Sequence, residues 1–289
     1  MLTSVKEILE KCKKDKTAIG AFNVSNLETI QAVVRAAAIK RFPVVVQITQ
    51  STLDYAGDME IAALARNIID ARGEGIPMGV HLDHGKSFDS CKRAIEIGFN
   101  SVMIDGSHLS FEENTSLTKK VADFGHSHNV SVQGELGTVP YLGKHSYADD
   151  ETVWERFMTN PKQAEEFVRV TGIDSLAVAI GNAHGFQKEK DTPDWDRLVR
   201  IAELTNLPLI LHGASDWNTG KIKMAIERGV TCFNVDTDIR IAFINRLCNY
   251  FEGGCTMDDP RKVMGAVRDA VQQRVEQKIT MFSSFDHEE

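Results

Sequence analysis

Features that mark secreted, membrane and nucleic-acid-binding proteins are missing from this sequence. Its five cysteines are odd in number and form no Cys-x-x-Cys pair, which argues against a disulfide framework and predicts a reduced, cytoplasmic protein. No apolar run is long enough to cross a bilayer, and residues 1–14 lack the apolar core of a signal peptide. Acidic residues outnumber basic ones, 41 to 33, without a dense basic stripe, so we expect neither a membrane nor a nucleic acid as partner.

What the sequence does contain is a series of short β-type runs that alternate with helical stretches. The runs cover residues 18–24, 43–49, 78–84, 101–106, 131–137, 175–181, 208–213 and 232–238. Near-continuous apolar strands separated by helices indicate a parallel sheet with helices on its outer face. We therefore predict one α/β domain over residues 1–289, a (β/α)8 or TIM barrel. A doubly wound open sheet is the alternative, which the lack of a Gly-x-Gly-x-x-Gly after the first run disfavours.

Two segments exceed the minimal barrel unit. Residues 138–172 form a long loop after the fifth strand, with a helix near residues 161–170, and an extra C-terminal helix covers about residues 259–282. Such a terminal helix packs either on the barrel or on a neighbouring subunit. Two pairs with capping-box spacing predict where helices begin: Ser25 with Glu28, and Ser110 with Glu113.

Polar side chains recur where the predicted strands end. In a (β/α)8 barrel these ends form one rim, and the active site is built there. The rim residues include Asn23, Thr49, Asp83, His84, Asp105, Glu135, Asn182, His184, His212 and Asn234. One such histidine or aspartate alone is most simply a hydrogen-bonded structural residue or a helix cap. Their concentration on one rim favours a functional site.

Three histidines on this rim have the same local setting. His84, His184 and His212 each follow a short apolar run, in the motifs H-L-D-H-G, G-N-A-H-G and L-I-L-H-G. Three imidazoles that meet at one rim can bind a zinc ion and leave its fourth position open to a substrate. We therefore predict a catalytic, rather than structural, metal site.

The last two strands lead into loops whose backbone N–H groups can bind an anion. These positions are Gly213, Ala214 and Ser215 after the seventh strand, and Asn234, Val235, Asp236 and Thr237 at the eighth. Phosphate sites in such barrels are often built from these two loops. Asp236 and Asp238 argue against a basic pocket, so backbone dipoles would hold the anion. For each loop alone, a tight turn or a helix cap is the simpler alternative.

Taken together, these motifs resemble the class II, zinc-dependent ketose-bisphosphate aldolases of the fructose-bisphosphate and tagatose-bisphosphate type. The resemblance runs through A-F-N-V-S-N-L-E-T, H-L-D-H-G, S-V-M-I-D-G-S, G-E-L-G, D-S-L-A-V-A-I-G-N-A-H-G, L-H-G-A-S, N-V-D-T-D-I-R and D-P-R-K-V-M. It implies reversible cleavage of a phosphorylated ketose to dihydroxyacetone phosphate and an aldehyde. Fructose 1,6-bisphosphate is the expected substrate, followed by tagatose 1,6-bisphosphate or another ketose 1-phosphate.

The resemblance also assigns roles to residues. The implied metal positions are His84, His184, His212, Asp105 and Glu135. The two carboxylates would border the zinc and could hold it, or a second cation, in an alternate place. Asp83 would move the proton of the C4 hydroxyl, while zinc as a Lewis acid stabilises the enediolate.

For the substrate, the resemblance adds Gly185 to the phosphate loops, with a monovalent cation, Na⁺ or K⁺, as an aid. Asn23 and Thr49 on the rim complete the predicted substrate-binding residues. Arg240 resembles an arginine that binds a second phosphate in some members, and a charge on a helix surface is the equal alternative. We expect a homodimer or homotetramer.

One segment departs from the family pattern. After Gly137 most members continue with Gly-Gly-x-Glu-Asp, whose glutamate moves protons at the enediolate carbon. Here the next acidic residue is Asp149, so Asp149, Asp150 or Glu151 would have to serve. The departure leaves open a non-catalytic barrel that binds sugar phosphates. The phosphate loops disfavour a metal-dependent hydrolase, and the lack of lysine in all the predicted strands disfavours a Schiff-base aldolase.

Overall fold

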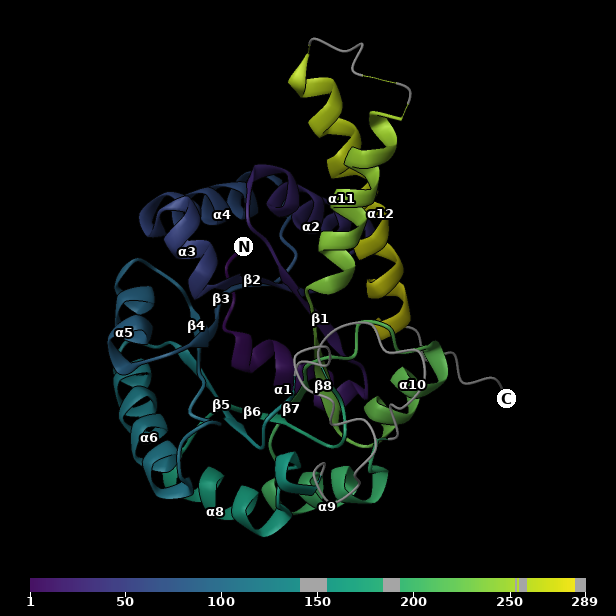
Figure 1. Ribbon diagram of the computed structural model, residues 1–289. Helices are drawn as coiled ribbons and strands as arrows, with labels where there is room; N and C mark the ends of the chain where they lie inside the picture. The colour runs from purple at the N-terminus through teal and green to yellow at the C-terminus, as the bar shows by residue number, and fades with distance from the viewer. Residues whose placement is uncertain (141–154, 184–192, 253, 255–258, 284–289) are drawn as a thin grey trace.

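The barrel predicted from the sequence is confirmed. The computed structural model describes residues 1–140, 155–183, 193–252, 254 and 259–283. Parallel strands form a closed barrel in chain order, with β8 paired to β1 (Figure 1). The strands are β1 Ile19–Asn23, β2 Val44–Thr49, β3 Met78–Gly85, β4 Ser101–Ile104, β5 Ser131–Leu136, β6 Ser175–Val178, β7 Leu209–Leu211 and β8 Val230–Val235. Because every strand of the closed barrel pairs with a neighbour on both sides, the sheet has no edge and an open sheet is excluded.

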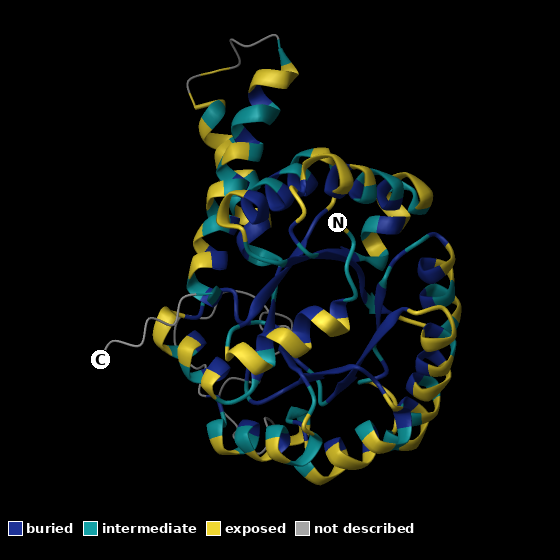
Figure 2. Cartoon of the chain, turned by 180° about the vertical axis from the view of Figure 1, so that it is seen from behind, coloured by how far each residue is buried: buried dark blue, intermediate teal, exposed yellow. Residues whose placement is uncertain are grey.

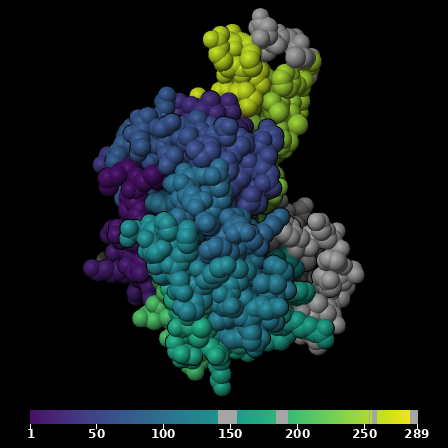
Figure 3. Space-filling view, turned by 90° about the vertical axis from the view of Figure 1, so that its left-hand side faces the viewer, coloured from purple at the N-terminus to yellow at the C-terminus, as the bar shows by residue number. Residues whose placement is uncertain are grey.

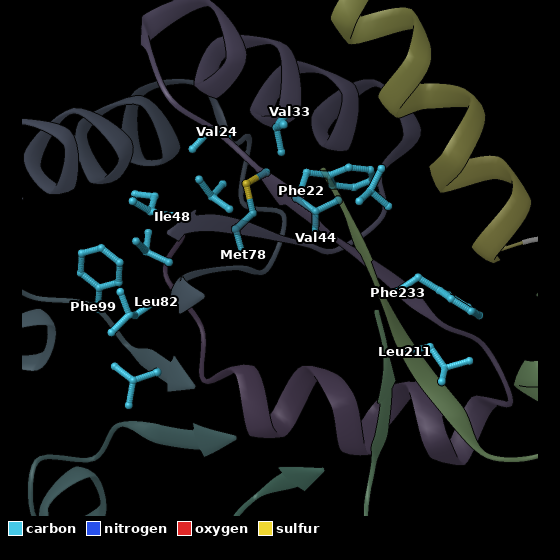
Figure 4. Close-up of a cluster of buried hydrophobic side chains, with 14 of the residues drawn as sticks. Phe22, Val24, Val33, Val44, Ile48, Met78, Leu82, Phe99, Leu211 and Phe233 are labelled. Atoms are coloured by element: carbon cyan, nitrogen blue, oxygen red, sulfur yellow. The ribbon is translucent and has the colours of Figure 1, made fainter. Parts of the chain in front are cut away.

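Helices surround the barrel on its outer face. They are α2 Leu27–Lys40, α3 Gln50–Ala56, α4 Asp58–Arg72, α5 Phe88–Glu96, α6 Phe111–Ser127, α8 Pro161–Thr171, α9 Trp195–Thr205 and α10 Thr219–Glu227. α11 Thr237–Tyr250, which follows β8, instead projects beyond the barrel. The apolar faces of these surrounding helices, with Val33 of α2 among their residues, pack on outward-pointing strand side chains such as Phe22 and Met78 (Figure 4). Burial of each such side chain stabilises the fold by about 1.5–3 kcal/mol.

Two helix starts test the capping-box predictions. At α6 the prediction is confirmed, because Ser110 Oγ accepts from the Glu113 N–H and the Glu113 carboxylate accepts from the Ser110 N–H. At α2 the prediction on Ser25 was wrong. Asn26 is the cap, its side chain accepts from the Thr29 N–H, and the Thr29 hydroxyl accepts in return from the Asn26 N–H. Asparagine caps as well as serine does, so the helix begins one residue later.

α1 (Val5–Asp15) covers the N-terminal end of the barrel. In Figure 2 it lies across this end, with its exposed face away from the strands. Its buried side chains are Val5, Ile8, Leu9 and Cys12. They pack against inward-pointing residues such as Ala177 and Ile210, which fill the barrel interior. The polar rim lies at the opposite end.

The predicted C-terminal helix is α12 (Pro260–Ser283), which forms a hairpin with α11 that projects beyond the barrel (Figures 1 and 3). Its buried apolar stripe consists of Val263, Val267, Val271, Val275, Ile279 and Phe282. Phe282 stacks on Phe233 of β8, with ring centroids 4.9 Å apart, and so ties α12 to the barrel. Among the described helices, none combines the length and the apolar character that a membrane span requires.

The Phe233→Ala variant is expected to lower the free energy of unfolding by about 3–5 kcal/mol. Phe233 is buried and stacked on Phe282, so its truncation leaves a cavity between the barrel and α12. Denaturant unfolding followed by circular dichroism measures the change. Phe251→Ala, at an exposed ring, is the control and should change the free energy by less than about 0.5 kcal/mol. A loss below about 1 kcal/mol for Phe233→Ala would contradict the role given to this contact.

Candidate active site

The carboxyl ends of the strands bring the predicted rim residues into one cleft. Its lining residues are Asn23, Thr49, Asp83, His84, His212, Gly213, Ser215, Asn234, Asp236, Thr237 and Arg240. All of them belong to the set that the sequence predicts. An adjoining cleft shares Thr49, Asp83 and His84 and adds Asp105 and Glu135. The two clefts therefore meet at Asp83 and His84.

Some predicted residues cannot be placed in this cleft. His184, Gly185, Asp149, Asp150 and Glu151 lie outside the described residues. Asn182, near the end of β6, is buried, and its Nδ2 donates to the carbonyl oxygen of His212 at 2.8 Å. It therefore braces the end of β7 rather than facing the cleft with its amide nitrogen.

The backbone at His84 explains how two consecutive residues reach the same cleft. Residues of a regular strand alternate between its two faces. At His84 φ is +49°, in the left-handed region, and the β3–β4 register shifts between Leu82 and Gly85. This conformation is costly for a residue with a Cβ and is found mostly at functional sites. Gly85 permits it, because a Cβ there would lie 2.7 Å from the carbonyl oxygen of Met103.

Carboxylates surround the imidazole of His84. Its Nδ1 lies 2.7 Å from Asp105 Oδ2 and 3.8 Å from Glu135 Oε2, and its Nε2 lies 3.7 Å from Asp83 Oδ1. Burial disfavours the charged ring, but the three carboxylates outweigh it and raise the pKa of His84 to about 10. Negative charge thus predominates here, which favours a bound cation.

The donor set at this point fits a metal ion. His84, Glu135 and His212 each offer one ligand atom, and these atoms lie within 4.8 Å of one another. Glu135 is 3% exposed, and its Oε2 accepts no hydrogen bond from the described residues. The pKa of Glu135 is raised to about 8, chiefly by burial. The negative charges of Asp105 and Asp83 also raise this pKa, whereas the positive charge of His84 lowers it. A cation would compensate this buried carboxyl group, and imidazole with carboxylate is a ligand set that zinc accepts.

Asp105 contacts His84 rather than joining this three-residue group. Its second oxygen accepts from the backbone N–H and the hydroxyl of Ser107. A carboxylate on the Nδ1 of a histidine ligand fixes the ring and its tautomer. In this arrangement Asp105 can orient His84 toward a metal.

Asp83 is held as a buried, ionised carboxylate at the junction of the two clefts. Its Oδ2 accepts from Asn23 Nδ2 at 2.9 Å, and its Oδ1 lies 3.4 Å from Asn234 Nδ2. Burial acts to raise the pKa of Asp83, but the charges of His84 and His212 and the Asn23 amide hold it below its usual value. Such a group can accept a proton from a bound hydroxyl.

Gln47 is a supporting residue that the sequence analysis missed. It is buried in β2, and its Nε2 donates to Asn23 Oδ1 at 3.0 Å, which fixes the amide that donates to Asp83. The signal was present, since Gln47 lies two residues before Thr49 and shares its face of the strand.

The two predicted phosphate loops lie side by side at the cleft. Gly213 has φ +67°, and Ser215 and Thr237 line the cleft with it. Thr237 is the first residue of α11, so the N–H groups of that helix's first turn are near the cleft. Ala214 and Val235 have side chains in the outer core, which leaves only their backbone groups for a ligand.

The eighth strand is shorter than predicted. β8 ends at Val235, and Asp238 lies inside α11, because the backbone at Asp236 already has right-handed helical angles. The Asp236 carboxylate forms an ion pair with Arg240 Nη2 at 2.6 Å, one helical turn later. The Arg240 side chain is 66% exposed at the cleft, so its position suits either predicted alternative.

Thr49 has a structural role besides lining both clefts. Its hydroxyl accepts from the Thr52 N–H and caps α3.

Comparison with known proteins bears directly on this cleft. The model of the class-II fructose-bisphosphate aldolase family matches residues 3–287. A fructose-bisphosphate aldolase from Geobacillus stearothermophilus is 37% identical over 285 residues, which are 98% of this chain and 97% of that one. The YdjI aldolase from Escherichia coli K12 superimposes with a TM-score of 0.85 at 30% identity, over 98% of this chain and 97% of that one. A fructose-bisphosphate aldolase from Campylobacter jejuni shares the fold, with a TM-score of 0.78 at 22% identity over 97% and 95% of the two chains.

Proposed function

Since the chain belongs to the class-II fructose-bisphosphate aldolase family, we propose that it uses zinc to cleave fructose 1,6-bisphosphate reversibly into dihydroxyacetone phosphate and glyceraldehyde 3-phosphate. Membership makes the chain an aldolase, a carbon–carbon lyase that acts on a phosphorylated sugar. The proposal adds the metal and the sugar. The observation that carries it is the convergence of His84, His212, Glu135 and Asp83 where the two clefts meet.

Zinc would be bound by His84 and His212, together with His184 from outside the described residues. Glu135 and Asp105 would border it, and Asp105 would keep the His84 ring in place through Nδ1. When bound, zinc supplies Lewis-acid stabilisation of the negative charge that develops on the ketose oxygens.

Asp83 would carry the proton. As the bond between C3 and C4 breaks, its carboxylate takes the proton of the C4 hydroxyl, and C4 becomes the aldehyde carbon of the leaving product. The bonding electrons remain on the three-carbon fragment as an enediolate. Its former C3 then takes up a proton to give dihydroxyacetone phosphate, and Asp149, Asp150 or Glu151, outside the described residues, would have to supply that proton. In the reverse direction Asp83 returns the proton to the new hydroxyl. Its lowered pKa supports this role, because the group is ionised at neutral pH.

The two loops would hold the phosphate on C1 by their backbone N–H groups. The proposed residues are Gly185, Gly213, Ala214, Ser215, Asn234, Val235, Asp236 and Thr237, with Na⁺ or K⁺ as an aid. Asn23, Thr49 and Arg240 would contact the rest of the substrate. We expect a cytoplasmic homodimer or homotetramer, in which the projecting α11–α12 hairpin contacts the neighbouring subunit.

The proposal is tested by cleavage of fructose 1,6-bisphosphate and tagatose 1,6-bisphosphate in parallel, before and after EDTA and after zinc is restored. Triose phosphate is measured by a coupled NADH assay. We expect chelation to abolish cleavage, zinc to restore it, and fructose 1,6-bisphosphate to be the faster substrate. Cleavage that survives complete metal removal would refute the role of zinc. Protein that contains zinc and cleaves neither sugar would point to another ketose 1-phosphate.

A further inference from the structure

Among the described residues, two charged side chains outside the clefts are almost fully buried: Lys278 of α12 and Asp238 of α11, each with 2% of the side chain exposed. The Nζ of Lys278 lies 3.0 Å from Asp238 Oδ2 in the first turn of α11. It also donates to the carbonyl oxygen of Ser215, in the loop after β7, at 2.5 Å. Arg274, one turn earlier in α12, donates to Asp238 Oδ1 from Nε at 2.8 Å. We call Lys278, Arg274 and Asp238 the Lys278 cluster.

Stability alone does not require a lysine at this position. Lys278 lies among the buried valines and Phe282 of the α12 stripe, where an apolar residue would pack without desolvating a charge. Replacement of a buried ion pair by apolar residues is often neutral or stabilising. Burial also lowers the pKa of Lys278, which reflects this cost. The function of Lys278 is therefore to be sought in the groups that its ammonium contacts, Ser215 and Asp238.

The Lys278 cluster connects the first of the two proposed phosphate loops to the helix that follows the second. Ser215 lines the cleft, and its carbonyl oxygen is held by Lys278 on the side of α12. Because a peptide unit is planar, holding this carbonyl fixes the orientation of the peptide after Ser215. Asp238 belongs to the helix whose first residue, Thr237, also lines the cleft. One side chain thus connects the loop after β7 to the start of α11.

The charges around Lys278 balance one another. Lys278 and Arg274 face Asp238, and the carboxylate of Asp216 also acts electrostatically on Lys278. The contribution of Lys278 to the cleft therefore lies in the backbone that it holds in place, and not in a net charge.

We propose that Lys278 is a positioning residue for the phosphate of the substrate, which it does not touch. It holds the loop of Gly213, Ala214 and Ser215 in place against the first turn of α11. This inference rests on the proposed function, because it presupposes that these loops bind the phosphate.

The test compares metal-loaded Lys278→Met with the unaltered protein. Titration calorimetry gives the Kd of inorganic phosphate, and steady-state assays give KM and kcat for fructose 1,6-bisphosphate. We expect Kd and KM to rise together by about tenfold or more, with kcat within about threefold, because a ground-state binding contribution is lost. Asp238 keeps its hydrogen bonds to Arg274, so the variant should fold.

Val271→Ala is the matched control, since it removes buried packing from the same helix and leaves the Lys278 cluster intact. It should leave the Kd of phosphate unchanged. An equal loss of phosphate affinity in Val271→Ala and Lys278→Met would overturn the positioning role. Should Lys278→Met not fold, Lys278→Gln is the alternative. It keeps a hydrogen-bond donor but is shorter and loses the ion pair with Asp238, so we expect it to raise Kd by about threefold or more.

Two results separate this inference from the function on which it rests. If the unaltered protein binds phosphate and cleaves the sugar but the Lys278 variants match it, only the positioning role fails. If the unaltered, zinc-containing protein neither binds phosphate nor cleaves the sugar, the proposed function fails and the inference fails with it.

Discussion

Replacement of His212 by alanine is expected to abolish metal binding and aldol cleavage together. His212 is 1% exposed, its ring packs edge-on against His84 with centroids 4.9 Å apart, and it belongs to the group whose ligand atoms converge. Loss of a residue that merely orients a ligand costs about 10–100-fold in metal affinity or activity, so loss of a ligand should cost more than about 100-fold. Metal content by plasma emission spectrometry and the cleavage rate provide the measurement.

His126→Ala is the matched control for this variant. His126 bonds through Nε2 to Asp174, which also pairs with Lys6 of α1 at the other end of the barrel. Its replacement should leave metal content and cleavage unchanged. A His212→Ala protein that retains both metal and full activity would show that the metal centre has been assigned to the wrong residues.

The Asp83→Asn variant is expected to retain its metal and to lose cleavage by about two or more orders of magnitude, the usual contribution of a general acid–base group. Asparagine preserves the shape of the side chain and can still accept from Asn23 Nδ2, so the surroundings of the cleft should persist. What it cannot do is take the proton of a hydroxyl. The rate under saturating substrate, with metal content measured on the same sample, tests this expectation.

Asn23→Ala provides the comparison for Asp83→Asn. It removes one hydrogen bond to the carboxylate but leaves the carboxylate itself, so its effect on kcat should be smaller. Near-normal cleavage by Asp83→Asn would mean that another group accepts the proton.

The rule that located the cleft from the sequence is geometric. Parallel strands in a closed barrel end on the same rim, so polar residues at strand ends meet in space however far apart they are in sequence. Asn23 and Asn234 illustrate it, because both approach Asp83 from strands at opposite ends of the chain.

The same rule could not predict two features of the structure: the backbone conformation at His84 and the burial of Lys278. Strict alternation along residues 78–84 would separate Asp83 from His84, and only the left-handed conformation at His84 joins them. Lys278 was missed although it had a signal, since it interrupts the apolar stripe that includes Val271 and Val275. A single polar residue in such a stripe is ordinarily read as a helix boundary or an exposed position, because burial of a charge is expensive.

The placement of α1 has a kinetic consequence. Because α1 and the packed interior fill one end of the barrel, the substrate enters and both products depart by the rim at the other end. The product that is released last still occupies the cleft that the next ketose must enter. Inhibition by this product is therefore competitive with the substrate. Running the reaction backwards imposes the reverse order, in which the fragment that leaves last during cleavage must bind first during synthesis.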